Sequence, residues 1–308
     1  MASVYPEHPQ NYSEIEAYVN RGVFRSDLFA RGKCFFYDTC SFRYHAKLSF
    51  DEVQPILSYM KDEDGVVIVV QCVIMELASR TGVLNPECIQ YFRTISESGL
   101  PIYVIKEEVL FDIMGVCFGT NAAINSYLVW LVRMLRGPVS TITKTLEEDP
   151  SLYEEVIKGR NLDSRGIYER FFSAVRANKE PQDHLGEELL AICLHMLSQL
   201  PGEADGKFCV ITDDKGAAGK MDELFEKTAR QHCGKRIIMF STPKLAQILY
   251  RKDYVKSREI LLGILGAGGS GKIRVLGMQI YDLKSHELSL SREEAADGIM
   301  ERSIHIIF

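Results

Sequence analysis

The stretch GVVIVVQCVIMELASRTG, residues 65–82, decides the fold of this chain. Residues 65–71 are a nearly continuous apolar run rich in β-branched side chains, which is typical of a strand buried on both faces. The run passes without a turn into residues 72–79, whose apolar positions have helical spacing, and Gly82 is a stop signal for that helix. A buried strand followed at once by a helix is the repeating unit of an α/β sheet.

The same alternation of short apolar runs and helical segments continues along the chain. Residues 110–182 have mostly helical patterning, and residues 184–200 have the pattern of an apolar helix. Short apolar strands that alternate with helices predict an α/β fold, with an open parallel sheet covered on both faces. In such sheets the functional crevice lies beyond the carboxyl ends of the strands. The other predicted strands are 33–38, 100–106, 207–214 and 235–242.

The composition of the 308-residue chain narrows the class of protein. A net charge of −6 argues against broad nonspecific adhesion to nucleic acid. No run approaches the roughly 18 apolar residues that a membrane span needs, and residues 1–18 lack an apolar secretion segment. The eight cysteines contain no C-x-x-C pair, which indicates reduced thiols. We therefore expect a cytoplasmic protein with no membrane association.

Acidic side chains recur at the ends of the predicted strands. Asp38 ends the first strand, Glu76 lies on the helix after the second, and Asp213 and Asp214 end the fourth. Each has an ordinary structural explanation: Asp38 as a helix N-cap, Glu76 as a surface residue, and the aspartate pair as turn chemistry. Their recurrence at one edge of one sheet favours a shared site.

The apolar helix pattern at 184–200 offers a further acid. Glu187 lies on roughly the same face as the apolar residues that follow it, and Asp183 lies one turn earlier. Glu188 points about 100° away and is expected to be solvated. Glu187 is the first choice for this acid, and Asp183 is the alternative.

Carboxylates gathered at one crevice repel one another, and each raises the pKa of the others. A divalent cation removes this conflict, because Mg²⁺ and Mn²⁺ prefer oxygen ligands, keep bound waters and can be shared with a phosphate. Two such ions about 3.5–4 Å apart activate a water and stabilise the leaving oxygen of a phosphodiester. The acids therefore predict a Mg²⁺- or Mn²⁺-dependent phosphodiester hydrolase that needs no nucleophilic side chain.

Taken in order, these segments resemble the PIN domain, a metal-dependent nuclease fold in which an open parallel sheet gathers three or four acids. The resemblance covers residues 33–109 and 183–252. It rests on YDTCS at 37–41, VIVVQCVIMELAS at 67–79, GEELLAICL at 186–194, VITDDKGA at 210–217 and MFSTPKLAQIL at 239–249.

The resemblance implies a ribonuclease with an RNA substrate. It makes Thr212, in the Thr-x-Asp ending of the fourth strand, a positioning hydroxyl. Arg43 and Lys215 lie near the acids in the sequence and are candidates for contact with RNA phosphates, with solvated surface charge as the ordinary alternative. The implied catalytic residues are Asp38, Glu76, Glu187 and Asp214, and the implied metal ligands are these four and Asp213.

Two segments depart from the PIN pattern. The insertion 110–182 separates the second and third acids, and its possible roles are to shape a substrate groove, to bind a regulatory protein partner or to block the site. Residues 255–308 follow the PIN-like domain, residues 1–254, as an extension without an assigned role. This extension is predicted to contain a helix with a capping box at Ser291 and two strands, 273–283 and 303–308.

The segment GAGGSGKI, residues 266–273, has the glycine and lysine spacing of a phosphate-binding loop. A working loop needs a helix after it and a Ser or Thr after the lysine. Here Ile273 follows Lys272, and the next residues have strand character, so we expect a flexible hairpin or linker loop. Contact between Lys272 and an RNA phosphate is a lesser role. The rival functions are a catalytically inactive PIN-like module that binds RNA or a protein partner, and a nucleotide hydrolase.

Overall fold

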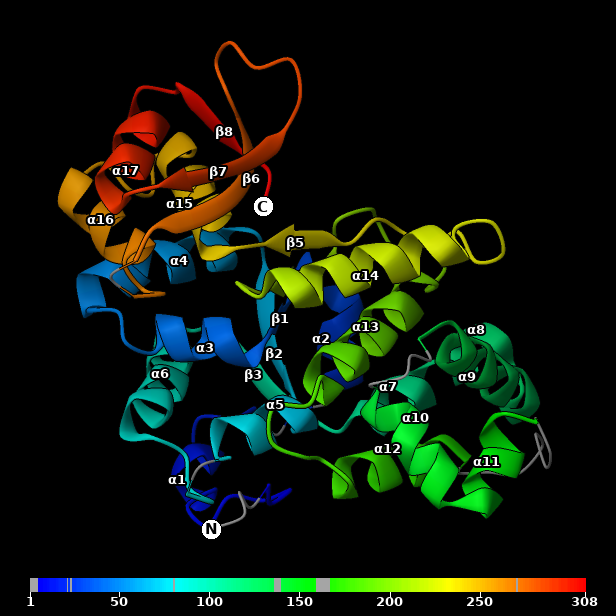
Figure 1. The fold of residues 1–308 in the computed structure, drawn as a ribbon. Helices are drawn as coiled ribbons and strands as arrows, with labels where there is room; N and C mark the ends of the chain where they lie inside the picture. The colour runs from blue at the N-terminus through cyan, green and yellow to red at the C-terminus, as the bar shows by residue number, and fades with distance from the viewer. Residues whose placement is uncertain are drawn as a thin grey trace.

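A five-stranded sheet forms the centre of the molecule (Figure 1). The structure is a computed structural model that describes residues 5–20, 22, 24–79, 81–135, 140–158, 167–269 and 271–308. All neighbouring strands of this sheet are parallel, in the order β3-β2-β1-β4-β5, which confirms the predicted α/β class. The strands are β1 (Lys33–Tyr37), β2 (Gly65–Val70), β3 (Ile102–Ile105), β4 (Phe208–Ile211) and β5 (Ile238–Phe240).

Each strand lies within its predicted range and is shorter than predicted. Residues at the carboxyl ends of three predicted strands serve instead as helix N-caps, namely Asp38, Asp214 and Ser241. The side chains of all three accept hydrogen bonds from the first turn of the following helix. β2 is buried along its whole length, as expected for a strand covered on both faces.

The strand order reverses beside β1. The chain builds β1, β2 and β3 outward on one side and then adds β4 on the other side of β1. In open α/β sheets, ligands bind outside the carboxyl ends of the strands at such a reversal. β1 runs directly into Asp38, and β4 is followed by Thr212, Asp213 and Asp214. The predicted acids of the first and fourth strands therefore lie at the reversal point.

Helices flank the sheet, and those that come after β1, β2, β3 and β5 begin within two residues of the end of the strand. Among the described residues, no helix is both long and apolar enough to cross a membrane. The helices outside the insertion and the extension are α1 (Ser13–Glu16), α2 (Phe24–Ala30), α3 (Thr39–His45), α4 (Phe50–Asp62), α5 (Gln71–Leu77), α6 (Pro86–Glu97), α13 (Leu185–Ser198), α14 (Lys215–Thr228) and α15 (Thr242–Arg251).

The insertion is helical, as predicted, although its residues 136–139 and 159–166 lie outside the described residues. Arg176, which is buried, pairs with Glu107 at 2.6 Å, Glu108 at 2.7 Å and Glu7 at 2.8 Å. Glu107 also accepts a hydrogen bond from the backbone N–H of Cys72 at 2.9 Å. This network fixes the end of the insertion to the helix that carries Glu76. Helices here are α7 (Glu107–Ile113), α8 (Gly115–Phe118), α9 (Asn121–Leu135), α10 (Thr141–Glu148), α11 (Pro150–Val156) and α12 (Ile167–Ala177).

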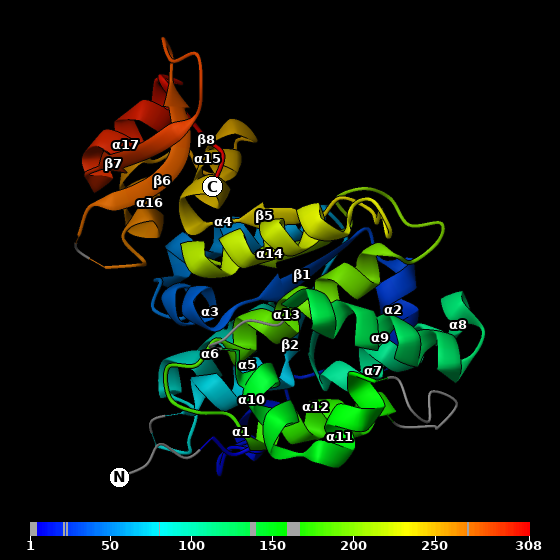
Figure 2. The ribbon, with the colours of Figure 1, turned by 45° about the vertical axis from the view of Figure 1, so that its right-hand side comes forward.

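The C-terminal extension forms a small antiparallel sheet with the order β7-β6-β8. Its helix begins with the predicted capping box at Ser291. Both predicted strands, 273–283 and 303–308, are present and shorter than predicted, and the third strand of the sheet, which pairs with the first of them, was not predicted. Figures 1 and 2 place this unit at one end of the molecule and the insertion helices at the other. Its elements are α16 (Arg258–Leu265), β6 (Ile273–Gln279), β7 (His286–Leu290), α17 (Arg292–Met300) and β8 (Ile304–Ile306).

Candidate functional site

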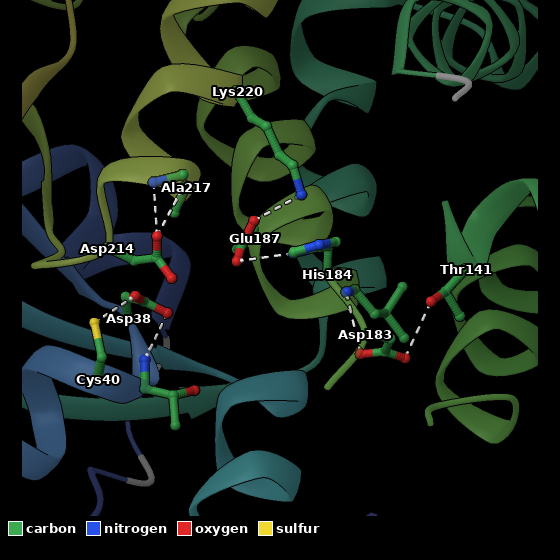
Figure 3. A network of polar contacts seen from close by, with 12 residues as sticks. Asp38, Cys40, Thr141, Asp183, His184, Glu187, Asp214, Ala217 and Lys220 are labelled. Carbon is green, nitrogen blue, oxygen red and sulfur yellow. Dashed lines mark hydrogen bonds and ion pairs between the residues drawn. The ribbon is translucent and has the colours of Figure 1, made fainter. Parts of the chain in front are cut away.

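Asp38 lies where β1 ends and α3 begins, and only 5% of the residue is exposed. Its Oδ1 accepts a hydrogen bond from the backbone N–H of Thr39 at 2.7 Å. Its Oδ2 accepts a hydrogen bond from Cys40 Sγ at 2.9 Å (Figure 3) and another from Thr212 Oγ1, also at 2.9 Å. Burial raises the pKa of Asp38 to about 6, since the donated hydrogen bonds only partly offset it and the nearby carboxylate of Glu76 raises it further. The helix cap is thus also a buried acid held close to a second acid.

Glu76 reaches the same place from the last turn of α5. The hydroxyl of Thr39 donates to Glu76 Oε2 while its N–H donates to Asp38, so this threonine bridges the two carboxylates. The other oxygen, Oε1, pairs with Lys179 Nζ at 3.0 Å. The carboxylate rests against Gly186 of α13, where a Cβ atom would lie 2.6 Å from Oε1. A side chain at position 186 would therefore displace the Glu76 carboxylate.

Lys179, just beyond α12, is a buried cation between two carboxylates. Its side chain is 3% exposed, and its Nζ pairs with Asp183 as well as with Glu76. The ring of Tyr5 covers it, with Nζ 5.0 Å from the ring centre. Burial lowers the pKa of Lys179, but the two carboxylates outweigh this effect and raise it above its ordinary value. Sequence reasoning missed Lys179, whose signal there is its place four residues before Asp183.

Glu187 and Asp183, the two choices for the third acid, have different partners (Figure 3). In the first turn of α13, Glu187 pairs with Lys220 of α14 at 2.8 Å and contacts His184 Nδ1 at 3.3 Å. Asp183 accepts a hydrogen bond from the hydroxyl of Thr141 at 3.0 Å, and backbone N–H groups donate to both of its oxygens. Asp183 therefore holds the insertion against the start of α13. Glu187, whose partners Lys220 and His184 are partly exposed side chains, is the better placed of the two to bind a ligand.

The three residues after β4 have separate tasks. The hydroxyl of Thr212 donates to Asp38 and accepts a hydrogen bond from the N–H of Asp214 at 3.2 Å, so it links the ends of β1 and β4. Asp214 is exposed and caps α14 through its Oδ1, which accepts backbone hydrogen bonds at 2.7 and 3.2 Å. Asp213 accepts hydrogen bonds from the N–H and the hydroxyl of Thr242, each at 2.6 Å. Asp213 thus ties β4 to α15, while Asp214 presents its carboxylate to solvent.

The two predicted phosphate contacts, Arg43 and Lys215, have protein partners in the structure. Arg43 Nη2 donates to the carbonyl oxygen of Glu76, which fixes the end of α5. Lys215 Nζ pairs with Glu287 of β7 at 2.6 Å, and both side chains are exposed. An exposed pair of this kind contributes little to stability. Lys215 therefore exchanges partners at little cost, whereas Arg43 has a structural task.

The donor atoms of the site suit a hard divalent cation in kind, since carboxylate oxygens are the ligands that Mg²⁺ and Mn²⁺ prefer. Within the described part of the chain, no group of three or more His, Cys, Asp or Glu side chains is placed to hold a metal ion. Instead, Lys179 and Lys220 each pair with one of the acids. Comparison with known proteins adds no relative: no family model, no curated protein and no solved structure matches the chain.

Proposed function

We propose that this chain is a PIN-like ribonuclease that depends on Mg²⁺ or Mn²⁺. One observation carries the proposal: acids from three separate elements meet at the reversal point of a parallel sheet, joined by two threonine residues. Thr39 connects Asp38 to Glu76, and Thr212 connects Asp38 to Asp214. A fold alone needs neither a buried aspartate beside a second carboxylate nor hydroxyls that orient both. A site for a cation and a phosphate accounts for this arrangement.

The residues that would hold the ion are Asp38, Glu76 and Asp214, with Glu187 as the fourth acid. Asp213 would support them through Thr242 rather than bind the ion directly. A bound divalent ion would supply a Lewis acid for the phosphate oxygens and lower the pKa of an attacking water. Binding would also remove the electrostatic conflict between Asp38 and Glu76, which adds to the effect of burial in raising the pKa of Asp38.

The side chains of the chain have defined tasks in this reaction. Thr39 and Thr212 hold the lone pairs of Asp38 in fixed directions, because each donates to a different oxygen of that carboxylate. Lys179 and Lys220 hold Glu76 and Glu187 in place and limit the negative charge that an RNA phosphate meets. In the hydrolysis, a water oxygen bonds to phosphorus, the ester P–O bond breaks, and the leaving ribose oxygen takes a proton.

The direct test measures hydrolysis of a single-stranded RNA and of bis(p-nitrophenyl) phosphate with Mn²⁺, with Mg²⁺ and with EDTA. We expect hydrolysis that depends on the metal and falls by about a hundredfold or more in Asp38→Asn, the size expected for loss of a major electrostatic contribution. The matched control is Asp51→Asn, an exposed aspartate in the first turn of α4. An Asp38→Asn variant that cleaves like the unchanged protein would refute the metal assignment.

A second function, a catalytically inactive PIN-like module that binds RNA or a protein partner, is favoured by a different observation. Lys179 and Lys220 already give Glu76 and Glu187 positive partners, so these acids need no metal ion for charge balance. This alternative predicts RNA binding or a stable protein complex without cleavage under any metal. The nucleotide hydrolase is not supported, because the glycine loop leads into strand β6 rather than a helix.

A further inference from the structure

A small pocket adjoins the acidic residues on the side of the C-terminal extension. Its volume is about 210 Å³, and Asp213, Tyr44 and Lys215 line it together with Lys272 and Arg274. Gly268, Gly269 and Gly271 of the glycine-rich loop complete its wall. A Cβ atom on Gly268 would lie 3.5 Å from the ring of Tyr44, so the loop passes directly over that ring. Ser270 of this loop lies outside the described residues.

A second, larger hollow continues from this pocket. It has a volume of about 760 Å³ and lies between α14, β5 and the C-terminal sheet. Lys215 and Phe308 line both spaces, so the two lie side by side. We name them together the C-terminal path. The floor of the larger hollow is apolar and includes Phe225, Leu276 and Ile307.

The cations of the C-terminal path are poorly compensated. Lys244 is half-buried; burial lowers its pKa, and the positive charges of Arg251 and Arg236 lower it further. Its Nζ donates to the carbonyl oxygen of Ile306 at 2.8 Å. Among the residues that the structure describes, no carboxylate forms an ion pair with Lys244 or Arg236. A half-buried charge without a counter-ion is costly, especially beside other cations, and an anionic ligand would remove that cost.

Cations along the whole length of the path point to a ligand with repeated negative charges. Lys272 and Arg274 lie at the end near Asp213, and Lys244 and Arg236 lie in the larger hollow. Two carboxylates also line the larger hollow: Glu287, which Lys215 holds, and Asp222. Cations interleaved with aromatic and apolar surface are the pattern that binds unpaired nucleotides, whose phosphates need charge and whose bases need a flat apolar contact.

We propose that single-stranded RNA lies along the C-terminal path, with its phosphates on Lys272, Arg274, Lys244 and Arg236 and its bases against Tyr44, Phe308 and the apolar floor. The strand passes Asp213 and so reaches the acids at the ends of β1 and β4. The larger hollow has the volume of a small-ligand site, which admits unstacked nucleotides and is too small for a duplex. This inference rests on the proposed function, whose substrate it places, and it gives the extension and the glycine loop a common task.

The test is fluorescence anisotropy with a fluorescein-labelled uridine 12-mer in EDTA, where metal-dependent cleavage is absent. The path variants are Lys272→Ala with Arg274→Ala, and Arg236→Ala with Lys244→Met. We expect each pair to weaken binding by about tenfold or more and to lower the slope of log affinity against log salt by about 1.4, or about 0.7 for each lost phosphate contact. The matched control is Lys227→Ala with Lys252→Ala, two exposed lysines off the path that pair with acids.

Binding by both path variants at the level of the unchanged protein would overturn the inference, and so would an equal loss in the control. Competition with polyglutamate separates RNA from an acidic protein partner: displacement of the RNA at matched charge would also overturn it. Hydrolysis of bis(p-nitrophenyl) phosphate, which is too small to extend along the path, distinguishes the two proposals. Path-dependent RNA binding without any such hydrolysis supports the path and refutes the nuclease. Hydrolysis of bis(p-nitrophenyl) phosphate, with RNA binding that both path variants retain, supports the nuclease and refutes the path.

Discussion

Replacing Gly186 by alanine should separate the stability of this protein from its activity. Gly186 lies in the first turn of α13, and an added Cβ would lie 2.6 Å from Glu76 Oε1 and 2.9 Å from Oε2. Ordinary contact begins near 3.4 Å, so the carboxylate must move by about 0.8 Å. Glu76 is the flexible end of a long side chain, so the helix stays in place and the carboxylate moves. That movement stretches its contacts with Lys179 and Thr39.

The two effects of Gly186→Ala have opposite signs. Alanine in a helix is more favourable than glycine by about 0.8–1 kcal/mol, which offsets the weakened contacts of Glu76, so the free energy of unfolding should change by less than about 1 kcal/mol. A misplacement of about 1 Å at a reacting site costs up to about a hundredfold in rate. We therefore expect kcat/KM for bis(p-nitrophenyl) phosphate with Mn²⁺ to fall between about tenfold and a hundredfold.

Urea unfolding and Mn²⁺-dependent hydrolysis, measured on the same samples, check this expectation. The control is Gly219→Ala in α14, where an added Cβ meets nothing within 4 Å. It should gain stability and keep its rate with the small substrate. If Gly186→Ala also keeps the rate of the unchanged protein, the position of Glu76 does not matter for hydrolysis, and its assignment to the site is wrong.

Two further predictions concern the contacts of the acids, and a third concerns the buried His195. Lys179→Met should lower the free energy of unfolding by about 3 kcal/mol, because it leaves Glu76 and Asp183 without their cation. If Lys179 and a metal ion compete for these acids, Mn²⁺ should raise the melting temperature of the variant more than that of the unchanged protein. An equal rise in both proteins would contradict this competition. Thr212→Val should lower metal affinity and cost about 1–3 kcal/mol of stability, because it removes a hydroxyl that donates to Asp38 and accepts from Asp214. In calorimetry, Thr212→Ser should regain the metal affinity and the stability that Thr212→Val loses. If the two variants behave alike, the hydroxyl has no role. Stability should fall in acid, because burial and nearby His232 lower the pKa of His195 to about 4, below its unfolded value of about 6.5. The stabilisation is present above pH 6.5 and is lost toward pH 4, and the loss between pH 7 and pH 5 is about 2 kcal/mol. Urea unfolding of His195→Gln should show a smaller loss of stability over the same pH range.

The sheet could be predicted because its strands carry their signal in sequence. A continuous apolar run such as residues 65–70 has few alternatives to a strand covered on both faces. The strand β7 was missed because it is an edge strand with mostly exposed residues. Helix α13 shows the opposite failure: it is buried on nearly all sides, so the prediction of a solvated Glu188, made from helical period alone, is wrong.

Part of the candidate site could be predicted from the sequence for a similar reason. Parallel strands bring their carboxyl ends to one edge, so the positions of Asp38 and Asp214 in the sequence already placed them near each other. The contact of Lys179 with Glu76 could not be predicted, because nothing near Lys179 in the sequence indicates that its side chain turns inward to Glu76. Its burial depends on α5, α12 and residue Tyr5 all meeting there.

The ion pairs at the C-terminal end of α12 limit how much of the insertion can be removed from this protein. Arg176 and Lys179 stand one turn apart and are the countercharges for Glu7, Glu107, Glu108, Glu76 and Asp183. A shortened chain that lacked residues 110–182 would keep all five acids and lose both cations. An acid such as Glu107, with 0% of its side chain exposed, would then be buried without a positive charge beside it. Removing the insertion would therefore require neutral replacements for these acids in the same step.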